Sequence, residues 1–162
     1  MLGYNAGSMG RKERRKNDEL RSSTMIRIED GYLFDRSVDV LNECFGKDFL
    51  GWQKGGYDLK TNGKKFIVWF PKLAVYENGI EKSQSSTVNI INTISADGTT
   101  IREYFPDENG LNVDETIRFT FAKFHREPYR YVGSFVIDPD ASTPMERIYR
   151  RIATEIDLKP WK

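Results

Sequence analysis

The sequence predicts an α+β fold, in which a twisted antiparallel sheet curls into a partial β-barrel braced by one internal and one C-terminal helix. Three observations predict this class: hairpin patterns fill the middle of the chain, a helical pattern precedes them, and a second helical pattern follows them. The length of 162 residues fits a single domain, which we expect over residues 25–162. Aromatic residues make up 13% of the chain, a high share that favours strands, stacking surfaces or both.

The first part of this domain is expected to contain two short strands and a helix. Residues 25–28 and 32–34 have the apolar character of short strands. A helix is expected over residues 36–46, with Ser37 as its N-cap and Gly46 as its stop. The apolar residues that recur at helical spacing within it are Val38, Leu41 and Phe45.

Three hairpins are expected in the middle of the chain. Asn62-Gly63 and Asp97-Gly98 tolerate the backbone angles that tight turns between strands require. Residues 66–70 are apolar on both faces, which is typical of a central strand. The hairpins are expected to pair residues 57–60 with 64–70, residues 88–92 with 100–104, and residues 117–124 with 129–137.

A C-terminal helix is expected over residues 143–156. Thr143 and Glu146 have the spacing of a capping box, and Pro144 stands at the first helical position. The apolar stripe expected to dock this helix on the sheet consists of Met145, Ile148, Tyr149, Ile152 and Ile156.

The chain begins with a basic segment, residues 1–24, that is expected to form a flexible arm with no buried face. Such an arm can bind a phosphate backbone through counterion release, or it can simply be solvated, and the sequence leaves both readings open. Its clustered cations are Arg11, Lys12, Arg14, Arg15 and Lys16.

The residues that are scarce in this chain exclude several classes of protein. One histidine and one cysteine cannot supply the four ligands of a typical zinc site, so no metal and no cofactor are expected. Residues 51–56 are glycine-rich but lack the Gly-Lys-Ser/Thr ending of a phosphate-binding loop.

His125 is expected to be an exposed loop residue and Cys44 a buried hydrophobe. The lone cysteine and the lack of a long apolar run indicate a cytoplasmic protein with no membrane partner.

The residue composition still allows one catalytic function, that of a magnesium-dependent nuclease. Asp58 and Lys60 have the Asp-x-Lys spacing of magnesium-dependent nucleases, in which carboxylates hold the metal and a lysine activates water. The alternative is a solvated hairpin end. The chain is more typical of a binding protein than of an enzyme.

Two further groups of residues are candidates for binding. The net charge is only +1, so any affinity for nucleic acid must come from charges placed on one surface. Trp52, Gln53, Lys54 and Lys72 could stack on a base, read its edge and contact its phosphates. The expected last helix would present Arg147, Arg150 and Arg151 on the face opposite its apolar stripe.

The aromatic and glycine spacing of Gly51-Trp52-Gln53, of residues 69–72, and of residues 121–123 and 129–135 resembles small β-domains of the PUA/SRA-like kind. The resemblance covers residues 50–152. Such domains accompany bacterial restriction nucleases and helicases. It implies a curled sheet braced by helices, and the modified-base readers among these domains hold a flipped base between aromatic rings.

The residues and the resemblance together predict a non-catalytic nucleic-acid-binding module of a bacterial or phage defence or counter-defence system, with DNA and RNA both open as ligands. Two alternatives remain at this point. One is a phage-encoded inhibitor, similar to an anti-CRISPR protein, that binds a host defence nuclease. Its acidic residues would mimic phosphates. The other is the magnesium-dependent nuclease.

Overall fold

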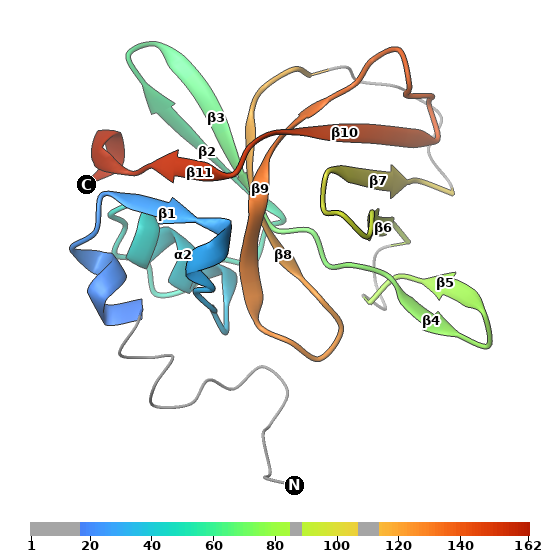
Figure 1. The fold of residues 1–162 in the computed structure, drawn as a ribbon, viewed down its shortest axis with the longest axis horizontal. Helices are drawn as coiled ribbons and strands as arrows, with labels where there is room; N and C mark the ends of the chain where they lie inside the picture. Colours follow the sequence, from blue (N-terminus) through green and yellow to red (C-terminus); the bar gives the residue numbers. More distant parts are fainter. Residues whose placement is uncertain (1–16, 85–88, 107–113) are drawn as a thin grey trace, which may run out of the picture.

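The computed structural model describes residues 17–84, 89–106 and 114–162 (Figure 1). Within these residues, seven strands form one mixed sheet in the order β2-β3-β8-β9-β10-β7-β6, and two further strand pairs, β1-β11 and β4-β5, stand apart from it. The strands are β1 (Met25–Arg27), β2 (Gly56–Thr61), β3 (Lys64–Trp69), β4 (Val75–Glu77), β5 (Ile80–Lys82), β6 (Ile91–Ile94), β7 (Thr100–Tyr104), β8 (Arg118–Lys123), β9 (Tyr129–Ile137), β10 (Glu146–Ala153) and β11 (Glu155–Asp157). The helices are α2 (Ser37–Cys44) and the short 3-10 helices η1 (Ile28–Asp30) and η2 (Lys159–Trp161).

The fold class expected from the sequence is confirmed, and the three hairpins are present, although the first strand of the second hairpin is Ile91–Ile94 where residues 88–92 were expected. β2 pairs with β3, β6 with β7, and β8 with β9, all antiparallel. Asn62 and Gly63 take φ angles of 48° and 77°, as a tight primed turn requires. β3 also pairs with β8 in parallel, which makes it the internal strand that its apolar run predicts.

The sheet buries both of its faces. One face packs against α2 and the β1-β11 pair through a core that includes Phe34, Phe45 and Phe121. The other face curls around a second core that includes Phe135 and Tyr149. In Figure 1, α2 and β1 lie on one side of the long strand β9, and β6 and β7 lie on the other.

The expected internal helix is present as α2, but Ser37 does not cap it. The N-cap is Arg36, whose backbone N–H donates to Asp39 Oδ2 at 3.1 Å. Ser37 is the first helical residue, and its hydroxyl donates a hydrogen bond to the Trp52 carbonyl. Gly46 ends the helix with a φ of 67°, and the Trp161 carbonyl occupies the space into which a Cβ would project.

The expected helix over residues 143–156 is wrong, because β10 occupies most of this segment and pairs with both β7 and β9. Glu146 N–H donates to Thr143 Oγ1 at 3.1 Å, as in a capping box. However, Thr143 and Glu146 also exchange two backbone hydrogen bonds, which close a turn instead of starting a helix. The gap between β7 and β9 demands a strand, and tertiary pairing overrides the local helical pattern.

Three smaller features also differ from expectation. Residues 32–34 form no strand, and Phe34 makes only an isolated bridge with Tyr129. The β4-β5 hairpin turns at Asn78 and Gly79 and was not expected. Residues 17–21 are helical, and Leu20 is fully buried, so the end of the expected arm does have a buried face.

Candidate functional site

A cavity of about 500 Å³ opens where the loop before β2 faces the end of β3 and the β6-β7 hairpin. Its walls combine aromatic rings with a few polar groups, as ligand pockets usually do. It is lined by Ser37, residues 52–55, residues 69–72, Ser83, Ile90, Asn92, Glu103 and Tyr129.

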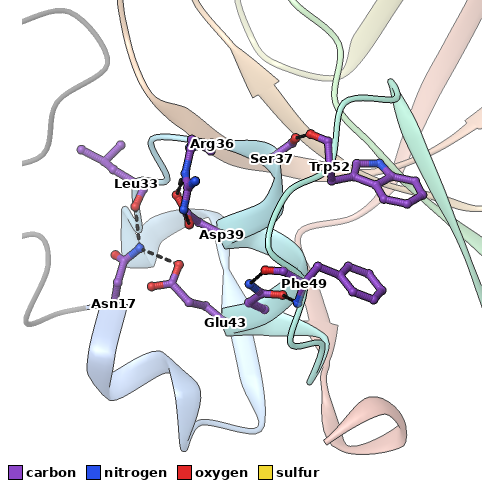
Figure 2. Close-up of polar contacts among 9 residues, drawn as sticks. Asn17, Leu33, Arg36, Ser37, Asp39, Glu43, Phe49 and Trp52 are labelled. Atoms are coloured by element: carbon purple, nitrogen blue, oxygen red, sulfur yellow. Dashed lines mark hydrogen bonds and ion pairs between the residues drawn. The ribbon is translucent and has the colours of Figure 1, made fainter.

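Helix α2 holds the loop that forms one wall of this cavity. The Ser37 hydroxyl donates to the Trp52 carbonyl at 3.1 Å, as Figure 2 shows. The Asn42 amide bonds the backbone of Phe49 in both directions, each at 2.9 Å. Because the loop is fixed at two points, α2 determines where Trp52 stands.

The Trp52 ring is packed by aromatic neighbours. Its centroid lies 4.9 Å from that of Tyr57 in an edge-to-face contact and 6.1 Å from that of Phe49 in a stacked one. Lys54 Nζ lies 6.0 Å from the Trp52 ring. This packing presents a rigid aromatic wall to the cavity.

Asn92 and Glu103 form the buried polar part of the lining. They are direct partners across the β6-β7 ladder, with exposed fractions of 8% and 7%. Asn92 Oδ1 has no hydrogen-bond partner among the described residues. Burial raises the pKa of Glu103, although the charges of Arg118 and Arg147 and a hydrogen bond from the Tyr149 hydroxyl at 3.2 Å oppose this shift.

Beside this pair, one cation contacts two aromatic rings whose centroids lie 4.9 Å apart. The Arg118 guanidinium is 4.8 Å from the Trp69 ring and 4.7 Å from the Tyr149 ring. This contact with both rings places a positive charge near Glu103. Trp69 is in turn a wall of the cavity.

The segment after β3 forms the basic rim. Leu73 N–H donates to the Lys123 carbonyl, and Lys123 N–H donates to the Pro71 carbonyl, each at 2.9 Å. Lys72 is exposed between these bonds. Burial and the neighbouring Lys72 lower the pKa of Lys123, whereas Glu127 opposes this shift.

The structure brings together one of the two groups of candidate residues. Trp52, Gln53, Lys54 and Lys72 all line this cavity. The sequence reasoning missed Asn92 and Glu103. Counting residues outward from the expected Asp97-Gly98 turn makes them cross-strand partners, but their importance depends on burial, which the sequence pattern does not show.

The three arginines expected on one helix face are separated by the strand. Arg150 lies on the face opposite Arg147 and Arg151, and it bonds Asp138 Oδ2 at 3.1 Å and Thr100 Oγ1 at 3.2 Å. Arg147 lies 4.4 Å from the Phe105 ring. Arg151 lines a different cavity. The arm cations Arg11, Lys12, Arg14, Arg15 and Lys16 lie outside the described residues.

The remaining candidates lie away from this cavity. Asp58 and Lys60 are exposed on β2, and Asp58 pairs with Lys65 at 3.7 Å. His125 is exposed, and Cys44 is fully buried, with its pKa raised by burial. In the described part of the chain, no three His, Cys, Asp or Glu side chains are placed to hold a metal. No helix within those residues is both long and apolar enough to cross a membrane.

Comparison with known families gives a match over most of the chain. Residues 19–158 match the family model of the SET and RING associated (SRA) domain. The chain belongs to the SRA domain family. The resemblance expected from the aromatic and glycine spacing is therefore confirmed, and the SRA match extends beyond the segment in which that spacing occurs.

One solved structure similar to this SRA domain is that of the 5-hydroxymethylcytosine-specific restriction enzyme AbaSI. The TM-score is 0.65 and the sequence identity 25%, over 93% of this chain. The chain spans only 47% of the length of that enzyme chain. None of the curated proteins compared with this chain matches it.

Proposed function

We propose that this SRA domain is a DNA-binding module of a restriction system and that its 500 Å³ cavity holds a modified cytosine flipped out of the duplex. The observation that carries the proposal is the buried pair of Asn92 and Glu103 in the cavity wall. The Glu103 carboxylate and the unpartnered Asn92 Oδ1 are both acceptors. Two acceptors match the two hydrogens of an exocyclic amine such as N4 of cytosine.

The aromatic walls supply the energy that flipping requires. Taking a base out of a duplex costs a few kcal/mol of stacking and pairing. Trp52, Trp69 and Tyr129 line the cavity, and stacking on such rings contributes about 1–3 kcal/mol per base. The rings can therefore offset most of the cost of extruding one base.

Two considerations favour a modified cytosine over other bases as the ligand of this cavity. Adenine also carries an amine, but the similarity to an enzyme specific for 5-hydroxymethylcytosine favours cytosine. The cavity is also larger than one pyrimidine needs, so it can accept a substituent at the 5 position. The family match favours this function over the defence-nuclease inhibitor and the magnesium nuclease that the sequence left open.

The contacts to the DNA backbone come from cations outside the cavity floor. Lys54 and Lys72 are exposed at its rim, where they can reach the phosphates that flank a flipped nucleotide. We include the arm cations, Arg11, Lys12, Arg14, Arg15 and Lys16, as further phosphate contacts.

The test measures the affinity of duplexes that differ only at one cytosine. Fluorescence anisotropy with cytosine, 5-methylcytosine and 5-hydroxymethylcytosine duplexes should show tighter binding of a modified duplex. Glu103→Gln replaces an acceptor oxygen with a donor, so it should weaken binding of the modified duplex, whose base enters the cavity, about tenfold. A duplex whose cytosine stays stacked should be affected less, so the preference should fall. A 2-aminopurine placed beside the modified base should brighten on binding, because flipping unstacks it.

The matched control is Asp58→Asn, an equally conservative change at an exposed carboxylate on β2. It should leave the affinity for all three duplexes unchanged. Loss of a DNA-cleaving activity in this variant would instead support the magnesium-dependent nuclease. If Glu103→Gln folds normally and keeps the full preference, or if all three duplexes bind equally, the proposed pocket is wrong.

A further inference from the structure

A second cavity, of about 570 Å³, shares no lining residue with the first. It opens where β1 and the segment after it face the β6-β7 turn across β9 (Figure 1). Its apolar surface comes from Ile28, Leu33, Ile94 and Val132, together with the rings of Tyr32 and Phe124. The proposed binding of a flipped base in the first cavity does not involve this second cavity.

Three arginines and one acid line it: Arg27, Arg130, Arg151 and Asp97. Arg27 pairs with Glu155 at 3.0 Å, and Arg130 pairs with a surface glutamate of the β8-β9 loop at 3.3 Å. All four of these side chains are more than 40% exposed, so both pairs are weak and can yield to a ligand. Arg151 makes no ion pair with any described residue.

The backbone is shaped to hold Arg151. Its aliphatic stem lies against Gly133, where an added Cβ would overlap Cδ and come within 2.8 Å of Cγ. Gly133 has a φ of 130°, which favours glycine. Both ladders of β9 shift register beside this glycine, one between Thr120 and Phe121 and the other between Arg151 and Ala153. Bulges of this kind re-aim side chains and are frequent next to binding sites.

The only acid in the lining does not neutralise Arg151. Asp97 Oδ1 accepts hydrogen bonds from the hydroxyls of Ser95 and Thr99, each at 2.7 Å, and from Thr99 N–H at 3.1 Å. These bonds, with a smaller contribution from Arg151, lower the pKa of Asp97 to about 2. Asp97 is thus charged and bonded within its own turn. The lining residues alone carry three positive charges and one negative charge, and the glutamates paired with Arg27 and Arg130 offset two of the positive charges until a ligand displaces them.

We propose that this second cavity binds the phosphate monoester of a nucleotide, with Arg151 as its central contact. A guanidinium fork suits phosphate oxygens, and a monoester carries about −1.5 to −2 charges at neutral pH, which matches the lining. A backbone diester carries one charge and matches it less well. The apolar and aromatic wall would receive the sugar and base. The monoester can belong to a free nucleotide or to the 5′ end of a DNA strand.

The probe is thymidine 5′-monophosphate, because thymine lacks the amine that the first cavity is proposed to read. Calorimetric titration should show saturable binding, and thymidine without the phosphate should bind at least about tenfold more weakly. Arg151→Gln should weaken binding of the monophosphate about tenfold. The matched control, Arg150→Gln, changes the neighbouring arginine on the opposite face and should change nothing. A 5′-phosphorylated duplex compared with its 5′-hydroxyl form separates the DNA end from the free nucleotide.

The outcomes are independent of the base pocket. Glu103→Gln should leave thymidine monophosphate binding intact, and Arg151→Gln should leave the preference for a modified base intact. The monoester site is wrong if neither the monophosphate nor the 5′-phosphorylated duplex binds measurably, or if Arg151→Gln binds both like the wild type. It is also wrong if Arg151→Gln weakens the 5′-hydroxyl duplex equally, because that result reassigns Arg151 to backbone diesters.

Discussion

Asn92 and Glu103 face each other across the β6-β7 ladder, and only one of them has its buried oxygen satisfied. The Tyr149 hydroxyl donates to Glu103 Oε1, whereas Asn92 Oδ1 has no hydrogen-bond partner among the described residues. A buried acceptor without a partner costs stability, so folding alone does not explain why an asparagine stands here. A ligand that donates a hydrogen would supply the missing partner.

This relationship predicts that Asn92→Leu stabilises the fold while it removes function. The change deletes an unmet acceptor, and we expect a gain of about 1 kcal/mol in the free energy of unfolding, together with loss of the preference for modified DNA. The matched control is Asn42→Leu, which breaks two good hydrogen bonds to Phe49 and should destabilise the domain. Urea denaturation measures both variants. A destabilised Asn92→Leu would show that Oδ1 has a partner in solution.

Local turn chemistry made the central hairpins predictable, whereas the binding pocket depends on long-range geometry. Asn62-Gly63 and Asp97-Gly98 fix their turns through adjacent residues, and the strands follow. The pocket instead joins residues 52–55 to strands β6 and β7, which lie about forty residues further along the chain. Trp52 could be selected by its residue type. Glu103 could not, because its importance comes from burial.

The C-terminal segment shows how a local signal misleads. The same residues that suggest a capping box close a turn. The stripe expected on one helix face is divided between the two faces of β10, which carries Ile148, Tyr149 and Ile152, and the separate strand β11, which carries Ile156. Consequently Ile152 is 52% exposed and Ile156 only 4% exposed. Ile156→Ala should cost about 2–5 kcal/mol, whereas Ile152→Ala should cost less than about 1 kcal/mol. If thermal unfolding showed equal losses of stability for the two variants, both isoleucines would be buried, as the expected helix requires, and the strand would be contradicted.

The end of the basic segment is expected to be structural. Leu20 is fully buried in the core, whereas Leu50 is fully exposed. Leu20→Ala should therefore lower the free energy of unfolding by about 2–5 kcal/mol, and Leu50→Ala should leave it nearly unchanged. Deletion of residues 1–22 should destabilise the domain for the same reason, although the sequence predicted that this segment has no buried face. An unchanged denaturation midpoint for Leu20→Ala would contradict this packing.

Glu43 should make stability depend on pH near neutrality. Burial raises the pKa of Glu43 to about 7, although a hydrogen bond from the Asn17 amide at 3.4 Å opposes the shift (Figure 2). A raised folded-state pKa means that the folded chain holds the proton longer than the unfolded chain does. Stability should thus fall as pH rises from about 4.5 to about 7, by at most about 3 kcal/mol. Glu43→Gln should remove this dependence, and denaturant titrations at several pH values measure it. A wild-type profile identical to that of Glu43→Gln would refute it.

The rim lysines and the buried pair should affect DNA binding in different ways. Lys54 and Lys72 are exposed at the cavity mouth, so they are suited to contact phosphates, which carry no sequence information. Lys72→Gln should weaken modified and unmodified duplexes equally and reduce the slope of log affinity against log salt by about 1. Glu103→Gln should change the ratio between the affinities of the two duplexes and leave that slope unchanged.

Lys60→Gln, at an exposed lysine on β2, is the control and should alter neither the ratio nor the slope. Anisotropy titrations from 50 to 200 mM salt, roughly the range over which phosphate contacts dominate affinity, give both the slope and the ratio. If Lys72→Gln changed the ratio, the lysine would be reading the base. The rim and the buried pair would then act as one recognition unit.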